Sequence, residues 1–318
     1  MAQLLGSAVE GILGFESAFG TPTSNGFQIA FNPDLKASSE KAINKSNEIT
    51  GDRSPQQGFL GFENGMFGGT FRVDTKQFPI FLKGLFGTPA TVDNGNGTYT
   101  HTFKIGSTVP SMCFEQSHTD ATGGLFYLTK GIGLNSMGIS FAGDDELTVS
   151  IDGVAQTTAK ATTTNFSGTV EDVTTGDKFA KFTSAVTGVD KVTDLSIDFS
   201  NNITADESRY LNGTGQIAGI PAGIASVSGS LSALMEDDTV FQKARDFETL
   251  SISATVTSGT NSIVFEMQEA NMASKTNPDI TTPNGLKIDG LGYEAFYKTG
   301  SNGSALTIKV TNTVTSYA

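Results

Sequence analysis

One short pattern occurs twice in this chain, about half its length apart. Ile29-Ala-Phe-Asn-Pro-Asp-Leu35 returns as Ile197-Asp-Phe-Ser-Asn-Asn-Ile203. Each copy is followed by a long polar segment, then by a strand rich in Gly and Ser, and then by a short amphipathic stretch. Self-similarity at a period of roughly 160 residues predicts a tandem duplication of one β-rich module. The fold must therefore use the same order of elements twice.

A strand and a helix are predicted after each copy. Phe67–Val73 and Val227–Ala233 alternate loosely between apolar and small polar residues, which indicates strands with one buried face. Apolar residues at helical spacing then follow, namely Phe78, Phe81, Leu82 and Leu85 in the first copy and Val240, Phe241, Ala244 and Phe247 in the second. This spacing predicts one short helix in each copy.

Residues at the helix ends support these two assignments. Pro79 suits the first turn, where its missing N–H has no intrahelical partner to lose. Gly87 suits the end of the first helix, because glycine readily takes a positive φ. Asp238 is expected to cap the second helix and to complement its positive end.

Composition favours a mainly β protein. The 318 residues include 37 Gly, and only 17% are charged, which suits many short strands and turns. In 195–200 and 227–232, apolar or glycine positions alternate with Ser or Asp, so one face of these strands is expected in the core. The opposite faces carry Ser, Thr, Asp and Gly. Such short polar side chains suit either plain solvent or the wall of a water-filled pore.

The expected organisation has four parts. Residues 1–28 are expected to form an N-terminal arm, 29–156 the first module, 157–164 a Thr/Ala-rich linker, and 165–318 the second module. Two long loops, 36–58 and 201–222, are expected at matching places in the modules. Loops of this length in a compact domain tend to be functional.

Net charge and cysteine content exclude several classes of protein. The formal net charge of −13 argues against a nucleic-acid-binding protein, because neutralising phosphates requires clustered Lys and Arg. A single cysteine, Cys113, permits no intrachain disulfide, and its apolar neighbours suggest a buried thiol. The first residues lack the basic region of a signal peptide, and no run of 18 apolar residues occurs. A reducing cytosol is the expected compartment of synthesis.

No catalytic, cofactor or metal site is predicted. The two histidines, His101 and His118, are expected to be structural strand residues, and no nucleophile elbow, zinc helix or phosphate-binding loop is present. The segments 93–97 and 172–177 faintly resemble calcium loops but lack the closing glutamate. The acids 144–146 and 236–238 are interpreted as a turn and a helix start. We therefore predict a protein that is not an enzyme and carries no cofactor.

Several stretches occur in an order that resembles a known family. They are Ser17-Ala-Phe-Gly-Thr-Pro22, the long loop before Gly65–Val73, the helix ending in Leu85-Phe-Gly-Thr-Pro89, His101-Thr-Phe103, Ser111–Glu115 and Leu128–Phe141. From Glu16 to Gly153 the chain resembles tail tube proteins of long-tailed bacteriophages. Phe182–Asp198 and Ile217–Ala233 resemble the second module of the two-module members. The order of these motifs carries the likeness, more than any single residue.

The resemblance implies a β-sandwich with one flanking helix in each module. It implies sheets that join between subunits into a large β-barrel channel, and it implies loops, here Lys36–Gly58 and Asn201–Ala222, that insert between stacked rings. Single-module relatives form hexameric rings. The implied role is a major tail tube subunit through which the genome passes during ejection. The implied partners are other copies of the chain and the tape measure, tail terminator and distal tail proteins.

Barrel geometry then predicts the ring size. At about 4.8 Å between strands and about 45° tilt, roughly 24 strands leave a lumen of about 40 Å, whereas roughly 12 leave only about 14 Å. A DNA duplex about 20 Å wide passes only the first. Four lumen strands from each of six modules give 24, so three chains suffice. A homotrimeric, pseudo-hexameric ring is expected, with a ring of six chains as the alternative.

Other readings remain open. A β-rich virion decoration protein, an adhesin or a tail-adaptor ring would share the composition. An enzyme or a sugar-binding β-sandwich is a further alternative, but the sequence lacks the group of residues that such a site requires. The expected location is the virion tail, with the host cytoplasm during assembly.

Overall fold

The computed structural model describes residues 5–54, 56–118, 123–181, 184–209, 213–235, 238–273, 279–282, 285–297 and 303–317. The strands are β1 (Val9–Phe15), β2 (Gly26–Ile29), β3 (Lys36–Asn44), β4 (Phe59–Arg72), β5 (Ala90–Asp93), β6 (Tyr99–Lys104), β7 (Met112–His118), β8 (Leu125–Ser140), β9 (Thr148–Ala155), β10 (Thr157–Ala161), β11 (Val170–Asp172), β12 (Ala185–Thr187), β13 (Val192–Ser200), β14 (Ser226–Leu234), β15 (Thr249–Ser258), β16 (Asn261–Met272), β17 (Asp279–Thr282), β18 (Gly285–Ala295) and β19 (Thr307–Asn312). The α-helices are α1 (Phe78–Phe86) and α2 (Thr239–Arg245). The chain is mainly β, as the composition predicts.

The central feature is an inner sheet of eight strands in the order β3-β4-β9-β8-β13-β14-β18-β17. Its two quartets, β3-β4-β9-β8 and β13-β14-β18-β17, have the same strand order. The antiparallel β8–β13 pair joins them, with Ile197 opposite Ile139. Within the described residues the sheet does not close on itself. Its outer strand on one side is β3, and on the other side β18 pairs with β17 at one end and with the end of β16 at the other.

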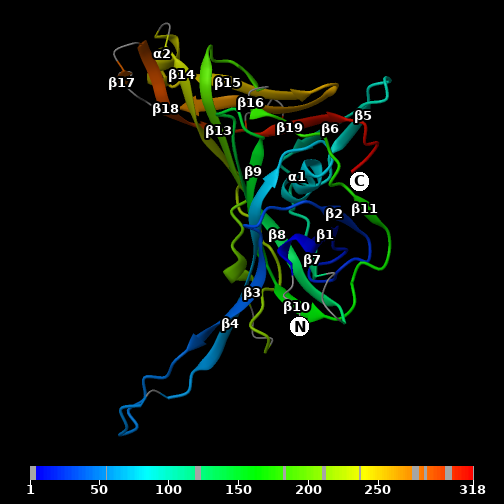
Figure 1. The fold of residues 1–318 in the computed structure, drawn as a ribbon. Helices are drawn as coiled ribbons and strands as arrows, with labels where there is room; N and C mark the ends of the chain where they lie inside the picture. The colour runs from blue at the N-terminus through cyan, green and yellow to red at the C-terminus, as the bar shows by residue number, and fades with distance from the viewer. Residues whose placement is uncertain are drawn as a thin grey trace.

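Two further sheets pack against the inner one (Figure 1). One contains β10, β8, β7, β1, β2 and β11. The other contains β12, β15, β16, β19, β6 and β5. In the second, the late strand β19 lies between β16 and the early strand β6, so the first and last thirds of the chain share one sheet.

Strand β8 belongs to two sheets. Its first half pairs with β7 and β10, and its second half pairs with β9 and β13. The apolar runs 125–129 and 137–141 suggest two separate strands, but the structure has one continuous strand through residue 140. Gly131 allows the bend between sheets, because its φ of 63° suits glycine. A register shift at Leu134/Ser136 accompanies the bend.

Both predicted helices are present. Almost all of α1 is buried, Pro79 lies in its first turn, and Gly87 follows its last residue with φ 93°. In α2 only Phe241 and Ala244 are buried. Phe247 was expected on the buried face but lies beyond the helix and is 71% exposed, because the helix ends at Arg245.

The cap predicted for α2 is only partly correct. Asp238 is the N-cap residue, but its side chain makes no capping hydrogen bond. Its carboxylate instead pairs with Arg245, one helical length away. The ion pair with Arg245 therefore takes the place of the expected hydrogen bond to the backbone.

Phenylalanine fills the core in the absence of Trp. Phe71 contacts Phe81 of α1 at a ring-centroid distance of 4.4 Å. Phe86 at the end of α1 stacks on Phe199 of β13 at 4.5 Å, and Phe78 lies 6.3 Å from Phe265. These last two contacts join early and late parts of the chain, so α1 packs on strands from both halves.

Three segments differ from the sequence-based expectation. Residues 9–15, in the expected N-terminal arm, form β1, which pairs along β7 and buries Leu13. Residues 157–161, in the expected linker, form β10 on the edge of β8. Residues 36–44, in the expected loop, form β3 and pair with β4. Strands β3 and β10 are edge strands with little apolar alternation, which gives a weak sequence signal. Strand β1 lies between β2 and β7, and Gly11 and Gly14 interrupt its apolar pattern.

The boundary between the two halves also differs. The expected second module begins at Asn165, yet β11 pairs in parallel with β2, and Phe166 is 4% exposed against the first half. The chain reaches the inner sheet again only at β13. Residues 162–181 therefore run over the first half, and we call them the connector below, whereas β12 pairs with β15 of the second half.

The repeated pattern does not mark equivalent strands. Ile29 ends β2 in the sheet with β1, whereas Ile197 lies within β13 of the inner sheet. The counterpart of the β13–β14 pair is the β3–β4 pair, each followed by a helix. The strands and helices after the pattern match, but the pattern itself is displaced.

The contact between Phe199 and Phe86 predicts a large stability effect. Phe199→Ala should lower the free energy of unfolding by about 3–5 kcal/mol, because it leaves a cavity between α1 and β13. Urea unfolding of the isolated subunit measures this. Phe59→Ala, at a side chain 61% exposed, is the control and should change it by less than about 0.5 kcal/mol. Equal effects for the two variants would contradict this account.

Candidate functional site: an open polar face and a projecting hairpin

The open face of the inner sheet, opposite the core, carries small polar side chains. Along β14, Val227 and Leu231 are buried while the serines between them alternate to the other side. The neighbouring strands continue this pattern in register. The open-face residues are Lys36, Ser38, Glu40, Asn64, Met66, Gly68, Thr70, Ser136, Gly138, Ser140, Ser150, Asp152, Asp194, Ser196, Asp198, Ser200, Ser226, Ser228, Ser230, Ser232, Asp289, Gly292 and Glu294. The alternation predicted from the sequence is confirmed here.

Acidic residues dominate the charge of the open face. Across the joint of the two halves, Asp152 lies opposite Ser136 and Asp198 lies opposite Gly138. Burial raises the pKa of Asp198 above its usual value. Asp289 accepts a hydrogen bond from Ser232 at 3.3 Å. A face of short hydroxyls and carboxylates offers water many partners and offers phosphates few cations.

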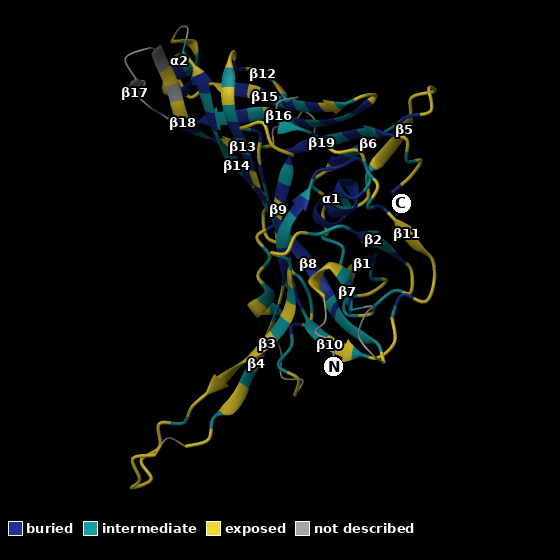
Figure 2. Cartoon of the chain, viewed as in Figure 1, coloured by how far each residue is buried: buried dark blue, intermediate teal, exposed yellow. Residues whose placement is uncertain are grey.

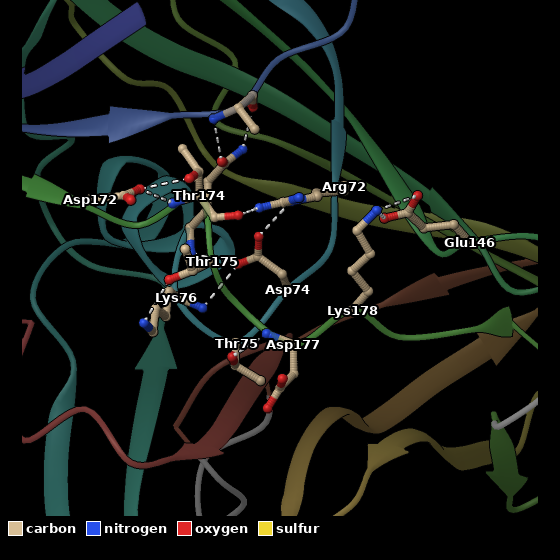
Figure 3. A network of polar contacts seen from close by, with 12 residues as sticks. Arg72, Asp74, Thr75, Lys76, Glu146, Asp172, Thr174, Thr175, Asp177 and Lys178 are labelled. Carbon is tan, nitrogen blue, oxygen red and sulfur yellow. Dashed lines mark hydrogen bonds and ion pairs between the residues drawn. The ribbon is translucent and has the colours of Figure 1, made fainter.

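The connector is fixed at one end of the inner sheet by a polar network (Figure 3). Asp74 is fully buried and accepts hydrogen bonds from the backbone of Lys76 and Gln77, at 2.9 and 2.6 Å, and from Arg72 Nε at 2.8 Å. The guanidinium of Arg72 also donates to the carbonyl of Thr174 in the connector. Asp74 thus links the first turn of α1 to the end of β4.

Two more contacts extend this network along the connector. Thr75 and Asp177 exchange hydrogen bonds, at 3.1 Å between backbones and 3.0 Å to the Thr75 hydroxyl. Lys178 forms an ion pair with Glu146 at 3.3 Å (Figure 3). The connector therefore lies fixed across the α1 end of the first half, which sets the position from which β13 begins.

A long hairpin of β3 and β4 projects from the body (Figures 1 and 2). Large apolar side chains on it face solvent, which is unusual for a free subunit. They are Ile43, Ile49, Phe59, Leu60, Phe62 and Met66, exposed by 37–99%. A strip of this kind marks a surface that is covered in an assembly.

The root of the hairpin is held by Glu63. Its carboxylate is buried and accepts hydrogen bonds from the hydroxyls of Ser39 and Thr157, at 2.7 and 2.5 Å, and from Gln216 Nε2 at 3.0 Å. Burial would raise the pKa of Glu63, but these donors and nearby Lys41 lower it below its usual value. Glu63 therefore stays ionised and joins three separate segments at one point.

Arg209 adds a second hold on the root. Its guanidinium donates to the carbonyls of Glu63 and Gly215, at 2.9 and 2.7 Å, and to the amide oxygen of Asn64 at 2.6 Å. It also lies over the ring of Phe62, at 5.1 Å. The expected second loop, 201–222, is thus folded onto the hairpin. No periodicity in the sequence signals Glu63 or Arg209, because their hydrogen-bond partners lie far away along the chain.

The two histidines have structural surroundings. His101 is fully buried on β6, with Nδ1 2.9 Å from the Thr91 hydroxyl and Nε2 2.9 Å from the carbonyl of Val314. Burial lowers the pKa of His101. His118 ends β7, where its ring lies 5.9 Å from that of Tyr127. Cys113 is buried, and burial raises the pKa of its thiol to about 11, so it is not a reactive thiolate.

The acidic segments considered for calcium make local hydrogen bonds. Asp93 accepts from the backbone of Gly95 in the β5–β6 hairpin turn at 2.8 Å, and Asp172 accepts from Thr174 at 2.8 Å. Glu236 and Asp237 lie outside the described residues. In the part of the chain that the structure describes, no group of three or more His, Cys, Asp or Glu side chains could hold a metal ion. No described helix has the length and hydropathy needed to cross a membrane.

Glu63 gives a stability prediction. Glu63→Ala should destabilise the subunit by about 2 kcal/mol, because it leaves buried donors from three segments unpaired. Urea unfolding measures the change, and amide exchange should rise at the root of the hairpin. Glu40→Ala, at an exposed residue of β3, is the matched control and should have little effect. Unchanged exchange in Glu63→Ala would show that the carboxylate does not hold the root.

Comparison with known proteins agrees with this architecture. No curated protein matches the chain at a significant level. The family model described as phage tail tube protein matches residues 6–295, which is most of the 318-residue chain. The chain therefore belongs to the phage tail tube protein family.

Proposed function

We propose that this virion tail protein is the major tail tube subunit, and that three copies close one ring of the tube. The observation that supports this most is the inner sheet of eight strands, whose outer strands β3 and β17 are unpaired on their far sides within the described residues. Three such sheets supply 24 strands. At about 45° tilt this gives a backbone radius of roughly 26 Å and a lumen wide enough for duplex DNA.

The pairing inside the chain supports the same proposal. The two quartets have the same strand order and are already joined edge to edge through β8 and β13. A second joint of this type, between the β17 side of one copy and β3 of the next, would repeat that pairing around the ring. The two halves then act as two tail-tube modules, and three chains give pseudo-sixfold symmetry.

In this ring the open face becomes the channel wall. Three chains carry a formal net charge of −39, three times −13. The open face carries acids and almost no cations, so it offers few binding sites to the phosphates of DNA. DNA then slides through the channel without specific binding. The fold serves as a conduit and has no enzymatic role.

The apolar strip on the β3–β4 hairpin supports stacking of rings. In the stacked tube the exposed apolar side chains of the hairpin would be buried against the next ring. The fixed root would set the direction of the hairpin. The tape measure, tail terminator and distal tail proteins would then meet the inside and the ends of the tube. Assembly would take place in the host cytoplasm. A many-copy tube subunit accounts for this hairpin better than a decoration protein or adhesin does.

Ring stoichiometry tests the proposal directly. Native mass measurement of single rings should give about 100 kDa, three chains of 33.3 kDa each. Electron microscopy of assembled tubes should show eight strands from each chain in the channel wall. Rings of six chains, with half of each chain outside the wall, would overturn the trimer.

The charge of the channel gives a second test. Asp152→Lys combined with Asp198→Lys should slow or stall genome ejection, because each ring then presents cations to passing phosphates. The measurement is the time course of DNA release from virions that carry the variant. Asp144→Lys with Asp145→Lys, in an exposed turn away from the open face, is the control. Unchanged release in the first variant would count against a role for the acidic wall.

A further inference from the structure

We propose that Phe247 and the groove beside it receive strand β3 of the next copy in the ring. The occupant is a second copy of this chain, bound through residues around its Ala37. This inference rests on the proposed ring and names the side chains of the joint between copies. It comes from comparing that open joint with the closed one inside the chain.

The two halves can be matched residue by residue around their helices. Phe67 on β4 and Val227 on β14 are both buried toward the core, and Phe81 of α1 and Phe241 of α2 are buried in the same way. Each pair is 160 residues apart. The same spacing matches Gly87, which follows α1, with Phe247, which follows α2.

The backbone supports this match at the helix ends. Gly87 has φ 93° and Phe247 has φ 54°, so both adopt a positive φ after their helix. Glycine does so freely, whereas an aromatic residue there is strained. Strain retained at one position, by a side chain that is 71% exposed, points to a role outside the isolated subunit.

The joint inside the chain shows what packs at the end of α1. There β13 pairs with β8, and Phe199 lies opposite Met137. The Phe199 ring is 2% exposed and stacks on Phe86. Asn201 Nδ2 donates to the carbonyl of Leu85, at 3.1 Å, near the end of α1. A strand from the second half thus packs a large side chain against the end of α1.

The matching place in the second half is an open groove. A cavity of about 510 Å³ lies beside Phe247, lined among others by Met272, Ala273 and Tyr293. The amide oxygen of Asn271, another lining residue, is buried and has no hydrogen-bond partner in the described structure. Strand β15 begins at Thr249, opposite Asn271, and so does not extend to Ala273. An added strand would start beside Ala273.

The strand that would enter this groove has a complementary shape. On β3, Ala37 lies opposite Phe67, as Phe199 lies opposite Val227 on β13. Ala37 is therefore the counterpart of Phe199. At the matched positions the internal joint has Gly87 and Phe199, and the joint between copies has Phe247 and Ala37. Each joint thus has one large and one small residue at these positions, but the large one comes from the opposite partner.

Three variants test this exchange of sizes. Phe247→Gly should fold at least as stably as the natural chain, because glycine accepts the positive φ, yet should raise the concentration needed for ring formation by at least tenfold. Ala37→Phe should also impair rings, because two large side chains then meet. The double variant restores the glycine and phenylalanine pair of the internal joint and should recover ring formation. Val92→Ala, at a residue 61% exposed on β5, is the control.

The readouts are circular dichroism and thermal melting for folding, and light scattering with electron microscopy for rings. Rings formed by Phe247→Gly at the concentration of the natural chain would overturn the proposal. A folded double variant that stays unassembled would overturn the pairing of Phe247 with Ala37. Failure of the natural chain itself to form rings would instead overturn the proposed function. If Ala37→Phe does not fold, Phe247→Gly alone decides the matter.

Discussion

The antiparallel pairing of β8 with β13 is the interaction on which the rest of the structure depends. It makes one inner sheet from two quartets, so that the polar face continues across the middle of the chain. Behind it, Phe199 closes the space against Phe86 at the end of α1. Edge-to-edge pairing is ordinarily a liability for a soluble protein, because each free strand edge can pair with a further chain. Here one such pairing is used inside the chain, and in the proposed ring the remaining edges pair with other copies.

A second set of contacts fixes the direction of the β3–β4 hairpin and the path of the connector. Glu63 and Arg209 fix the hairpin root to the segment that joins β13 to β14, and the network of Asp74 fixes the connector to α1. Each uses buried, charge-assisted hydrogen bonds, which are stronger and more specific in geometry than exposed ion pairs. The exposed apolar side chains of the hairpin are thereby presented at a set angle. A surface meant for repeated assembly gains from such rigidity, because less entropy is lost on contact.

Sequence reasoning could predict what depends on local pattern. The alternation in 227–232 assigned the two faces of β14, and the spacing of Phe78, Phe81 and Leu82 located α1. It could not predict which strands pair, because period two indicates a face but no neighbour. For this reason the sequence predicts β8 as two strands, and it predicts β3 as a loop because its residues are mostly polar and exposed. Phe247 fits the helical period and still lies outside the helix, since the chain turns after Arg245.

The position of β19 has a consequence for how the subunit is made. This strand pairs with β6 on one side and β16 on the other, and the Thr100 and Thr311 hydroxyls meet across 211 residues. Until the ribosome has released residues 307–312, the early hairpin of β5 and β6 and the late hairpin of β15 and β16 have nothing between them. Contacts so distant along the chain form slowly and late. The sheet that holds β5, β6, β15 and β16 together can therefore form only after residues 307–312 have emerged.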